Sequence, residues 1–246
     1  LKPLAEKYGI DTSDEAIRAA VEQHNEVCRL IRAIGDFRKE ANPRVTGYEF
    51  HILTLVSYVA PKHLIVDQLR ETLEEIKTRE PDAADKYRAR VVFVGSEVDD
   101  VDVIRLVEES GAYVCADRFC YGSLPGRDEI LLNDDEDVVK QVCRQVQGRA
   151  QCPRYWDMAK MTGRRDYVAD LAKEYGADGI IYEQMKFCDP WAYERMIGTI
   201  VLRDEHGYPV LAVDRPYSIG SSGQMRTRVQ AFVESIEIKK IQGGKK

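Results

Sequence analysis

The sequence predicts an α/β fold: a doubly wound sheet, flavodoxin-like or Rossmann-like, of about four parallel strands preceded by a layer of helices. In residues 1–88, hydrophobic residues recur at the three- and four-residue spacing of amphipathic helices. From residue 89 onward, short hydrophobic runs alternate with amphipathic stretches, which is the pattern of β-α units in a parallel sheet. We therefore expect a helical segment over 1–88 and an α/β domain over 89–246.

Helix-start signals define the elements of the first segment. Thr12 with Glu15, and Thr46 with Glu49, have the spacing of capping boxes, so we expect helices to begin at these two places. A third helix is expected from Pro61, since proline is well tolerated in a first helical turn, and it should end near residue 80. These helices form the predicted helical layer.

Four hydrophobic runs are the expected strands of the second segment. The first, Arg90–Val94, is rich in valine and is followed by glycine, which is typical of a strand buried on both faces. Helices are expected near 101–110, between 136 and 175, from Trp191 and from Gly223. The other three strands are expected at 112–116, 178–182 and 209–214.

Composition and charge exclude several classes of protein. Lys and Arg total 36 against 42 Asp and Glu, and no basic run is interleaved with aromatic residues, so nucleic acid is not expected as a partner. The longest hydrophobic stretches fall far below the roughly 20 residues that span a bilayer, so no membrane segment is expected. The chain opens with Leu1 and without a signal-like hydrophobic core, so we expect further sequence upstream.

The cysteines indicate a reducing cytoplasm, because they lack the tight repeated spacing of a disulfide framework. No C-x2-C pair is present, which argues against a zinc ribbon or a ferredoxin run. Buried cysteine commonly behaves as a small hydrophobic residue, and we expect packing roles for four of the six. These four are Cys28, Cys115, Cys143 and Cys152.

Cys120 and Cys188 are the candidate metal ligands. Each follows an expected strand, and the carboxyl ends of parallel strands meet at one edge of the sheet. Soft thiolates gathered in a reducing compartment favour an iron–sulfur cluster or another soft metal. The four histidines share no spacing, so a zinc site or histidine base is not indicated.

The segment Ser218–Gly223 is a candidate anion site. It precedes a helix, and its backbone N–H groups and the helix terminus suit a phosphate or carboxylate. The alternative is a flexible loop with a serine cap, which the sequence alone favours. Arg226 and Arg228 follow on the helix, where they either clamp an anion or are simply solvated.

Two motifs resemble the 2-hydroxyacyl-CoA dehydratase and benzoyl-CoA reductase superfamily. Asp178–Ile181 followed by Lys186–Pro190 resembles the late cluster-ligand motif, and Gly223–Glu234 is similar to the closing helix after the strand Pro209–Asp214. The segment Ala116–Gly126 is more similar to the corresponding loop of benzoyl-CoA reductase subunits than to the dehydratases. The resemblance covers nearly the whole chain.

The resemblance implies a cofactor and partners. It implies a [4Fe–4S] cluster, or a larger double-cubane cluster, with Cys188 as a ligand and Cys120 near the cluster or substrate. It also implies a heterodimer with a homologous subunit, an ATP-hydrolysing iron–sulfur activator, and further cluster cysteines in an upstream α/β domain that this sequence lacks. The acyl-CoA substrate accepts single electrons, and Ser218, Gly220, Ser221 and Gly223 are candidates to bind its thioester or CoA phosphates.

Three functions therefore remain open. A subunit that reduces an aromatic acyl-CoA, benzoyl-CoA reductase-like, is favoured by the segment around Cys120. A 2-hydroxyacyl-CoA dehydratase subunit, which acts by ketyl radical chemistry, is the alternative within the superfamily. A cluster-free scaffolding or binding subunit is the alternative from another class.

Overall fold

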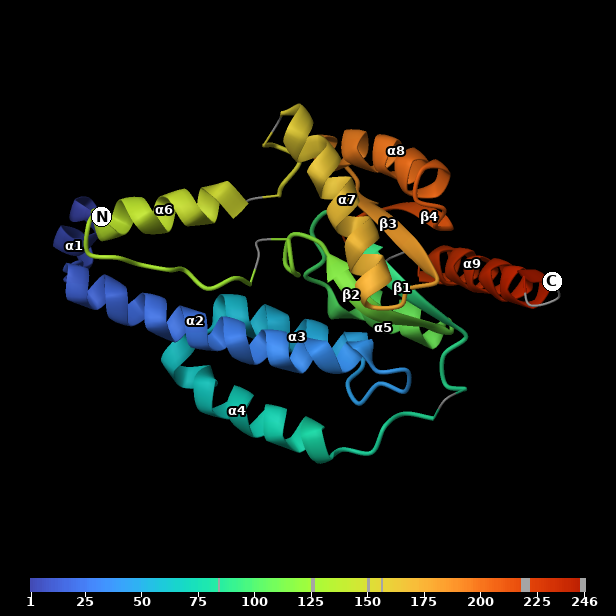
Figure 1. Cartoon of the computed structure of the whole chain (residues 1–246), viewed down its shortest axis with the longest axis horizontal. Helices are drawn as coiled ribbons and strands as arrows, with labels where there is room; N and C mark the ends of the chain where they lie inside the picture. Colours follow the sequence, from blue (N-terminus) through green and yellow to red (C-terminus); the bar gives the residue numbers. More distant parts are fainter. Residues whose placement is uncertain (84, 125–126, 150, 156, 218–221, 244–246) are drawn as a thin grey trace.

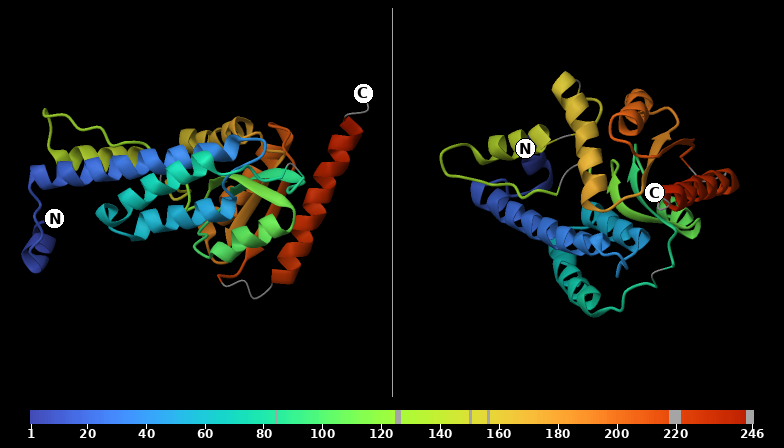
Figure 2. Two further views of the ribbon diagram at one scale, coloured as in Figure 1. Left: turned by 90° about the horizontal axis from the view of Figure 1, so that it is seen from below. Right: turned by 45° about the vertical axis from the view of Figure 1, so that its right-hand side comes forward.

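A computed structural model describes residues 1–246 apart from 84, 125–126, 150, 156, 218–221 and 244–246. Its first part is helical, as expected, and extends away from the sheet (Figure 1). The N-terminus lies at the far end of this layer, and the last helix lies on the opposite side of the molecule (Figure 2). The elements of this part are α1 (Lys2–Tyr8), α2 (Asp14–Asp36), η1 (Phe37–Lys39), α3 (Gly47–Val59) and α4 (Lys62–Thr78).

The second part is a parallel four-stranded sheet in the order β2-β1-β3-β4. This topology confirms the predicted doubly wound α/β fold. The strands are β1 (Ala89–Val94), β2 (Ala112–Arg118), β3 (Gly179–Met185) and β4 (Val210–Arg215). The helices are α5 (Val101–Glu109), α6 (Val138–Arg149), α7 (Met158–Glu174), α8 (Asp189–Asp204) and α9 (Ser222–Gly243).

Helices cover both faces of the sheet. One hydrophobic core joins α5 and α9 to residues such as Val91 and Phe93. A second core joins α7 and α8 to the alternate residues, among them Val92 and Ile180. The strands are hydrophobic on both faces because each face is buried under a helical layer. A third core, centred on Ile34, holds α2, α3 and α4 together.

The predicted helix starts are right in one case and displaced in two. Thr46 and Glu49 form the expected capping box: Thr46 Oγ1 accepts from the Glu49 N–H at 3.0 Å, and Glu49 Oε2 accepts from the Thr46 N–H at 2.8 Å. The predicted box at Thr12 is wrong, because Ser13 is the residue that caps α2. Pro61 precedes α4 as its N-cap rather than occupying the first turn.

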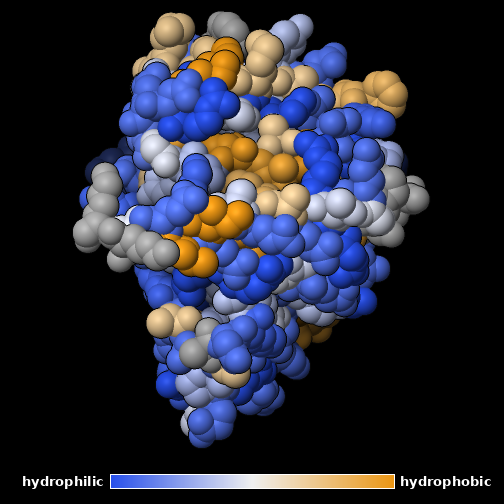
Figure 3. Space-filling view, turned by 90° about the vertical axis from the view of Figure 1, so that its right-hand side faces the viewer, coloured by the Kyte–Doolittle hydropathy of each residue, from blue (hydrophilic) through white to orange (hydrophobic). Residues whose placement is uncertain are grey.

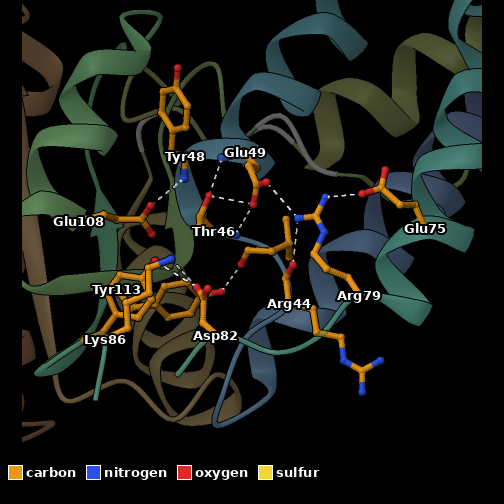
Figure 4. A network of polar contacts seen from close by, with 12 residues as sticks. Arg44, Thr46, Tyr48, Glu49, Glu75, Arg79, Asp82, Lys86, Glu108 and Tyr113 are labelled. Carbon is orange, nitrogen blue, oxygen red and sulfur yellow. Dashed lines mark hydrogen bonds and ion pairs between the residues drawn. The ribbon is translucent and has the colours of Figure 1, made fainter. Parts of the chain in front are cut away.

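Polar contacts tie α3 to its neighbours (Figure 4). Glu108 of α5 accepts hydrogen bonds from the Gly47 and Tyr48 N–H groups at 2.8 and 3.1 Å, and Arg79 reaches Glu49 at 2.9 Å. Burial raises the pKa of Glu108 to about 7, although the backbone N–H groups of Tyr48 and Gly47 oppose that rise. The helical layer is thus joined to the α/β part through the start of α3.

Hydrophobic side chains form a band on the side of the molecule where α8, β4 and α9 lie (Figure 3). Tyr193, Met196 and Ile200 of α8 are exposed, and the edge strand β4 is only partly buried at Val210–Ala212. Among the helices that the structure describes, none combines the length and the hydrophobicity needed to cross a membrane.

Candidate functional site at the carboxyl rim of the sheet

The carboxyl ends of the strands form a continuous rim. The connection from β1 leads to β2 on one side of it, and the next connection leads to β3 on its other side. The rim between β1 and β3 is therefore the topological switch point. Ligands of open α/β sheets bind in the crevice at this point. Gly95–Ser96, Phe119–Cys120 and Lys186–Cys188 follow the ends of β1, β2 and β3.

Ser96 links the ends of three strands. Its carbonyl accepts from the Cys120 N–H at 2.9 Å, its hydroxyl donates to Glu183 Oε2 at 2.8 Å, and the same hydroxyl accepts from the Met185 N–H at 2.6 Å. Its own N–H donates to Glu183 at 3.0 Å. Because Ser96 is fully buried, this arrangement fixes the segment of Cys120 relative to the end of β3.

Gly95 allows this close approach. A Cβ at this position would lie 2.5 Å from the Glu183 carbonyl oxygen and 2.6 Å from Glu183 Oε2, nearer than atoms can pack. The residue at the end of β1 must therefore lack a side chain for β1 and β3 to meet as they do.

Glu183 and Arg215 form a buried ion pair under the rim. Arg215 Nε of β4 lies 2.9 Å from Glu183 Oε1 of β3. Burial raises the pKa of Glu183, against the opposing effects of the Arg215 charge and the Ser96 hydrogen bonds. Arg215 also donates to the backbone carbonyls of Pro216 and Tyr217, so it holds the segment after β4 in place.

Cys188 stands at the N-terminus of α8. Phe187, before it, has a φ of 72° and is 98% exposed, and this left-handed turn brings the chain from β3 into the helix. The Cys188 N–H donates to the Met185 carbonyl at 3.1 Å. Burial raises the pKa of the Cys188 thiol, while the Trp191 backbone N–H lowers it. The start of a 16-residue helix favours a thiolate at this position.

The structure brings Cys120, Cys152 and Cys188 into one neighbourhood. All three pack against the core under α7 and α8, and burial raises the pKa of Cys120 to about 11, with Cys152 and Cys188 adding to the rise. The buried Trp191 indole N–H faces the Cys120 thiol and opposes that rise, although the two groups do not reach the geometry of a full hydrogen bond. Arg154 Nε lies 3.2 Å from the Cys152 sulfur.

Cys152 packs against this core as expected, and it is also near enough to Cys120 and Cys188 to raise the pKa of both thiols. Burial confirms the packing roles of Cys28 and Cys115. The packing role expected for Cys143 is wrong, because this side chain is exposed. In α6 the buried residues are Val138 and Gln141, and Cys143 lies on another face of the helix.

The candidate anion segment is only partly described. Ser218, Gly220 and Ser221 lie outside the described residues, and Gly223 lies in the first turn of α9. Arg226 pairs with Glu109 at 2.8 Å, and Arg228 donates to the Ala212 carbonyl at 2.6 Å. Both arginines are therefore engaged within the chain.

The residue types at the rim suit an iron–sulfur group, but the described residues there are too few to hold one by themselves. Thiols are the ligands of such clusters, and a buried indole N–H beside a thiol is a donor of the kind that cluster sulfurs accept. Among the residues the structure describes, however, no three or more Cys, His, Asp or Glu side chains form a set that could hold a metal ion by themselves. Further ligands would be needed.

Comparison with known proteins identifies the family. The sequence model described as "2-hydroxyglutaryl-CoA dehydratase, D-component" matches residues 1–236. The chain belongs to the 2-hydroxyglutaryl-CoA dehydratase D-component family. The resemblance inferred from the motifs around Cys188 and Cys120 is thereby confirmed at the level of the family.

Curated relatives of this family member include subunits of several acyl-CoA enzymes. The chain is 25% identical over 238 residues to the beta subunit of the (R)-phenyllactyl-CoA dehydratase of Clostridium sporogenes, with 96% of the chain and 61% of the relative covered. It is 26% identical over 240 residues to the beta subunit of the (R)-2-hydroxyglutaryl-CoA dehydratase of Acidaminococcus fermentans, with 95% and 61% covered.

A benzoyl-CoA reductase subunit of Thauera aromatica is 23% identical over 235 residues, with 94% of the chain and 59% of the relative covered. The chain thus spans about three-fifths of the length of the relatives it matches.

Sequence reasoning missed several residues of the rim in this family member. Glu183 and Arg215 had a detectable signal, since each is a charged residue at the end of a hydrophobic strand. Ser96 and Trp191 had no comparable signal, because their importance comes from contacts between segments far apart in the sequence.

Proposed function

We propose that this chain is part of an iron–sulfur subunit that passes low-potential electrons to an acyl-CoA thioester. The observation that carries the proposal is the packing of Cys120, Cys152 and Cys188 against one hydrophobic core at the carboxyl rim, where the Trp191 indole N–H faces the Cys120 thiol. Membership of the family and the names of its relatives support an acyl-CoA substrate.

Cys188 and Cys120 are the proposed ligands from this chain, with Cys152 beside them. Other ligands would come from outside these 246 residues, in line with the greater length of the relatives. A [4Fe–4S] cluster supplies single electrons at a potential that hydrogen bonds to its sulfurs and burial adjust. A double-cubane cluster is the alternative.

Binding of a metal to these thiols would require the loss of their protons. Burial holds the Cys120 and Cys188 thiols protonated at neutral pH, so binding of iron must displace their protons. The N-terminus of α8 and the Trp191 indole then favour the resulting thiolates. Ser96 and Gly95 keep the segment of Cys120 in position.

The proposed assembly has further components. A homologous subunit would form a heterodimer with this one, and an ATP-hydrolysing iron–sulfur activator would deliver the electrons. The relatives are themselves named as subunits, which supports an assembly of more than one chain.

Iron and sulfide analysis tests the cofactor. The full-length complex, purified anaerobically, is expected to contain a cluster that decreases in Cys188→Ser and stays unchanged in Cys143→Ser, since Cys143 is exposed on α6, which lies away from the sheet (Figure 1). An unchanged cluster in Cys188→Ser contradicts the ligand assignment. An iron-free, colourless complex favours the cluster-free scaffolding alternative.

Substrate assays separate the two reactions. Reduction of an aromatic ring, as in the benzoyl-CoA reductases, is the first candidate because of the segment around Cys120. Dehydration of a 2-hydroxyacyl-CoA is the second, and the names of the dehydratase relatives at 25% and 26% identity favour it. With the reduced activator, turnover of only the 2-hydroxyacyl-CoA eliminates the first, and turnover of only benzoyl-CoA eliminates the second.

A further inference from the structure

A cationic cavity of about 400 Å³ lies between α2, α7 and the end of β2. It is separate from the ion pair of Glu183 and Arg215, yet it shares two chain segments with the thiol rim. Arg118 is two residues before Cys120, and Gln151 is next to Cys152. The cations that line the cavity are Arg32, Arg38, Lys39, Arg118, Arg127 and Arg149.

Acidic residues do not balance this charge. The lining contains four carboxylates, Asp36, Asp117, Asp128 and Glu174, against the six cations, which leaves an excess of two positive charges. Two of the four, Asp36 and Glu174, are within 2.8 and 2.5 Å of Lys39 and are engaged by it. Among the lining residues that the structure describes, Asp117 and Asp128 are the carboxylates left for the five arginines.

The buried part of the wall has the same imbalance. Arg38 and Arg118 are 3% and 4% exposed, and Asp117 is the buried carboxylate beside them. Asp117 Oδ1 lies 3.2 Å from Arg38, and Asp117 Oδ2 lies 3.9 Å from Arg127. Burial of a cation without a matching anion is unfavourable, so the wall is poised to accept negative charge.

The other contacts of these arginines are with neutral groups, so they do not compensate the positive charge. Arg118 donates to the Ser123 carbonyl at 2.6 Å and lies over the Tyr167 ring at 4.4 Å, and neither group carries a negative charge. Arg38 Nε is buried and has no hydrogen-bond partner among the described residues. Arg149 donates to the backbone carbonyls of Asp128 and Glu129.

We propose that this cavity binds the phosphate groups of a nucleotide-bearing ligand. The planar guanidinium fork matches phosphate oxygens in pairs, and several arginines on one concave surface are suited to more than one phosphate group. Two ligands share this chemistry: coenzyme A, which carries a diphosphate and a ribose 3′-phosphate, and a free nucleotide. The choice of coenzyme A rests on the proposed function, because the neighbouring thiol rim would then act on its thioester.

Arg32 offers the cleanest test. It is exposed, lines the cavity and has no ion pair among the described residues, so its replacement should not unfold the protein. Arg29, one turn earlier on α2, is also exposed and does not appear in the lining. Arg29→Met removes the same charge from the same helix, together with an ion pair to Glu129, and is the control.

Calorimetric titration of the full-length protein, in complex with any partner chain that copurifies, gives the readout. Coenzyme A, dephospho-coenzyme A, ADP and inorganic phosphate are the probes. We expect Arg32→Met, and independently Arg149→Met, to raise the Kd of coenzyme A about tenfold, as loss of a charged hydrogen bond does, whereas Arg29→Met changes it less than about twofold. Equal effects of Arg32→Met and Arg29→Met, or no binding of any probe to the wild type, overturn the proposal.

The same probes identify the source of the phosphates. Weaker binding of dephospho-coenzyme A than of coenzyme A assigns the site to the 3′-phosphate of a CoA thioester, whereas ADP binding as tightly as coenzyme A assigns it to a free nucleotide. Iron content, measured in parallel, separates this proposal from the proposed function. Phosphate binding by an iron-free complex rejects only the cluster, and a cluster-containing complex that binds no probe rejects only the cavity.

Discussion

Glu183 of β3 and Arg215 of β4 form an ion pair inside the sheet, with the two side chains 0% and 4% exposed and their charged atoms 2.9 Å apart. Removal of one partner would leave the other charge buried without compensation. The pair lies beneath the rim that holds Cys120 and Cys188. Loss of the pair would therefore disturb the positions of these two residues.

Glu183→Gln is expected to destabilise the fold by about 3–5 kcal/mol, because Arg215 then stays buried without a counter-charge. Urea denaturation measures the free energy of unfolding. Glu136→Gln, which breaks the exposed pair with Arg144, is the control and should change that free energy far less, because solvent screens an exposed ion pair. Similar losses of unfolding free energy in the two variants would show that the buried Arg215 charge does not need Glu183 for its compensation.

Gly95→Ala is expected to destabilise the protein by about 1–3 kcal/mol, because the added methyl group would overlap Glu183. Gly163→Ala is the matched control: it lies within α7 with no atom within 4 Å of an added Cβ. There, alanine should stabilise the helix by roughly 0.5–1 kcal/mol. Thermal or urea unfolding gives both values, and a stabilising Gly95→Ala would contradict the close approach of β1 and β3.

Glu108 should make stability depend on pH in the neutral range. Its pKa in the folded protein is about 7, raised from 4.5 chiefly by burial. A raised carboxyl pKa contributes stability that is present below the unfolded value and is lost as the pH rises through the folded value. The glutamine in Glu108→Gln does not titrate. The free energy of unfolding of this variant should therefore rise relative to that of the wild type as the pH increases from 4.5 to 8.

Urea denaturation at several pH values measures this difference. Glu109→Gln, an exposed neighbour on the same helix, is the control for loss of a carboxylate from α5. If the wild type and Glu108→Gln show the same pH dependence, the Glu108 carboxylate, which contacts the start of α3, is charged throughout the range.

Alkylation should distinguish the cysteines by burial. Among the described cysteines Cys143 is exposed, and it should react first with iodoacetamide at pH 8. Cys115 is fully buried, burial raises its pKa to about 11, and its reaction should await global unfolding. Peptide mass spectrometry after timed labelling reports each rate, and equal native-state rates at Cys143 and Cys115 would contradict the packing of β2.

Local patterns in the sequence were sufficient for the fold. The valine-rich run before Gly95 and the hydrophobic run around Ile180 predicted β1 and β3, because strands covered on both faces require continuous hydrophobicity. The placement of Cys120 and Cys188 on one rim followed from the rule that parallel strands end together. Helix starts were less certain, since Ser13 and Thr12 offer equivalent caps.

Contacts between distant segments were beyond reach. Cys152 lies in a turn between α6 and α7, and no periodicity connects it to Cys120 or Cys188. The cationic cavity has the same origin: Arg32 and Arg118 come from different parts of the fold, and η1 and α3, which contact both α2 and β2, bring them together. Cys143 shows the converse, because a hydrophobic environment in the sequence did not bury it.

Ser96 attaches the ends of β1, β2 and β3 to one another through a single buried residue. Loops fastened in this way rearrange little when charge is added or withdrawn nearby, because their dipoles are already oriented. A redox centre at such a place would need little relaxation of its surroundings on each electron transfer, and it would therefore exchange electrons rapidly.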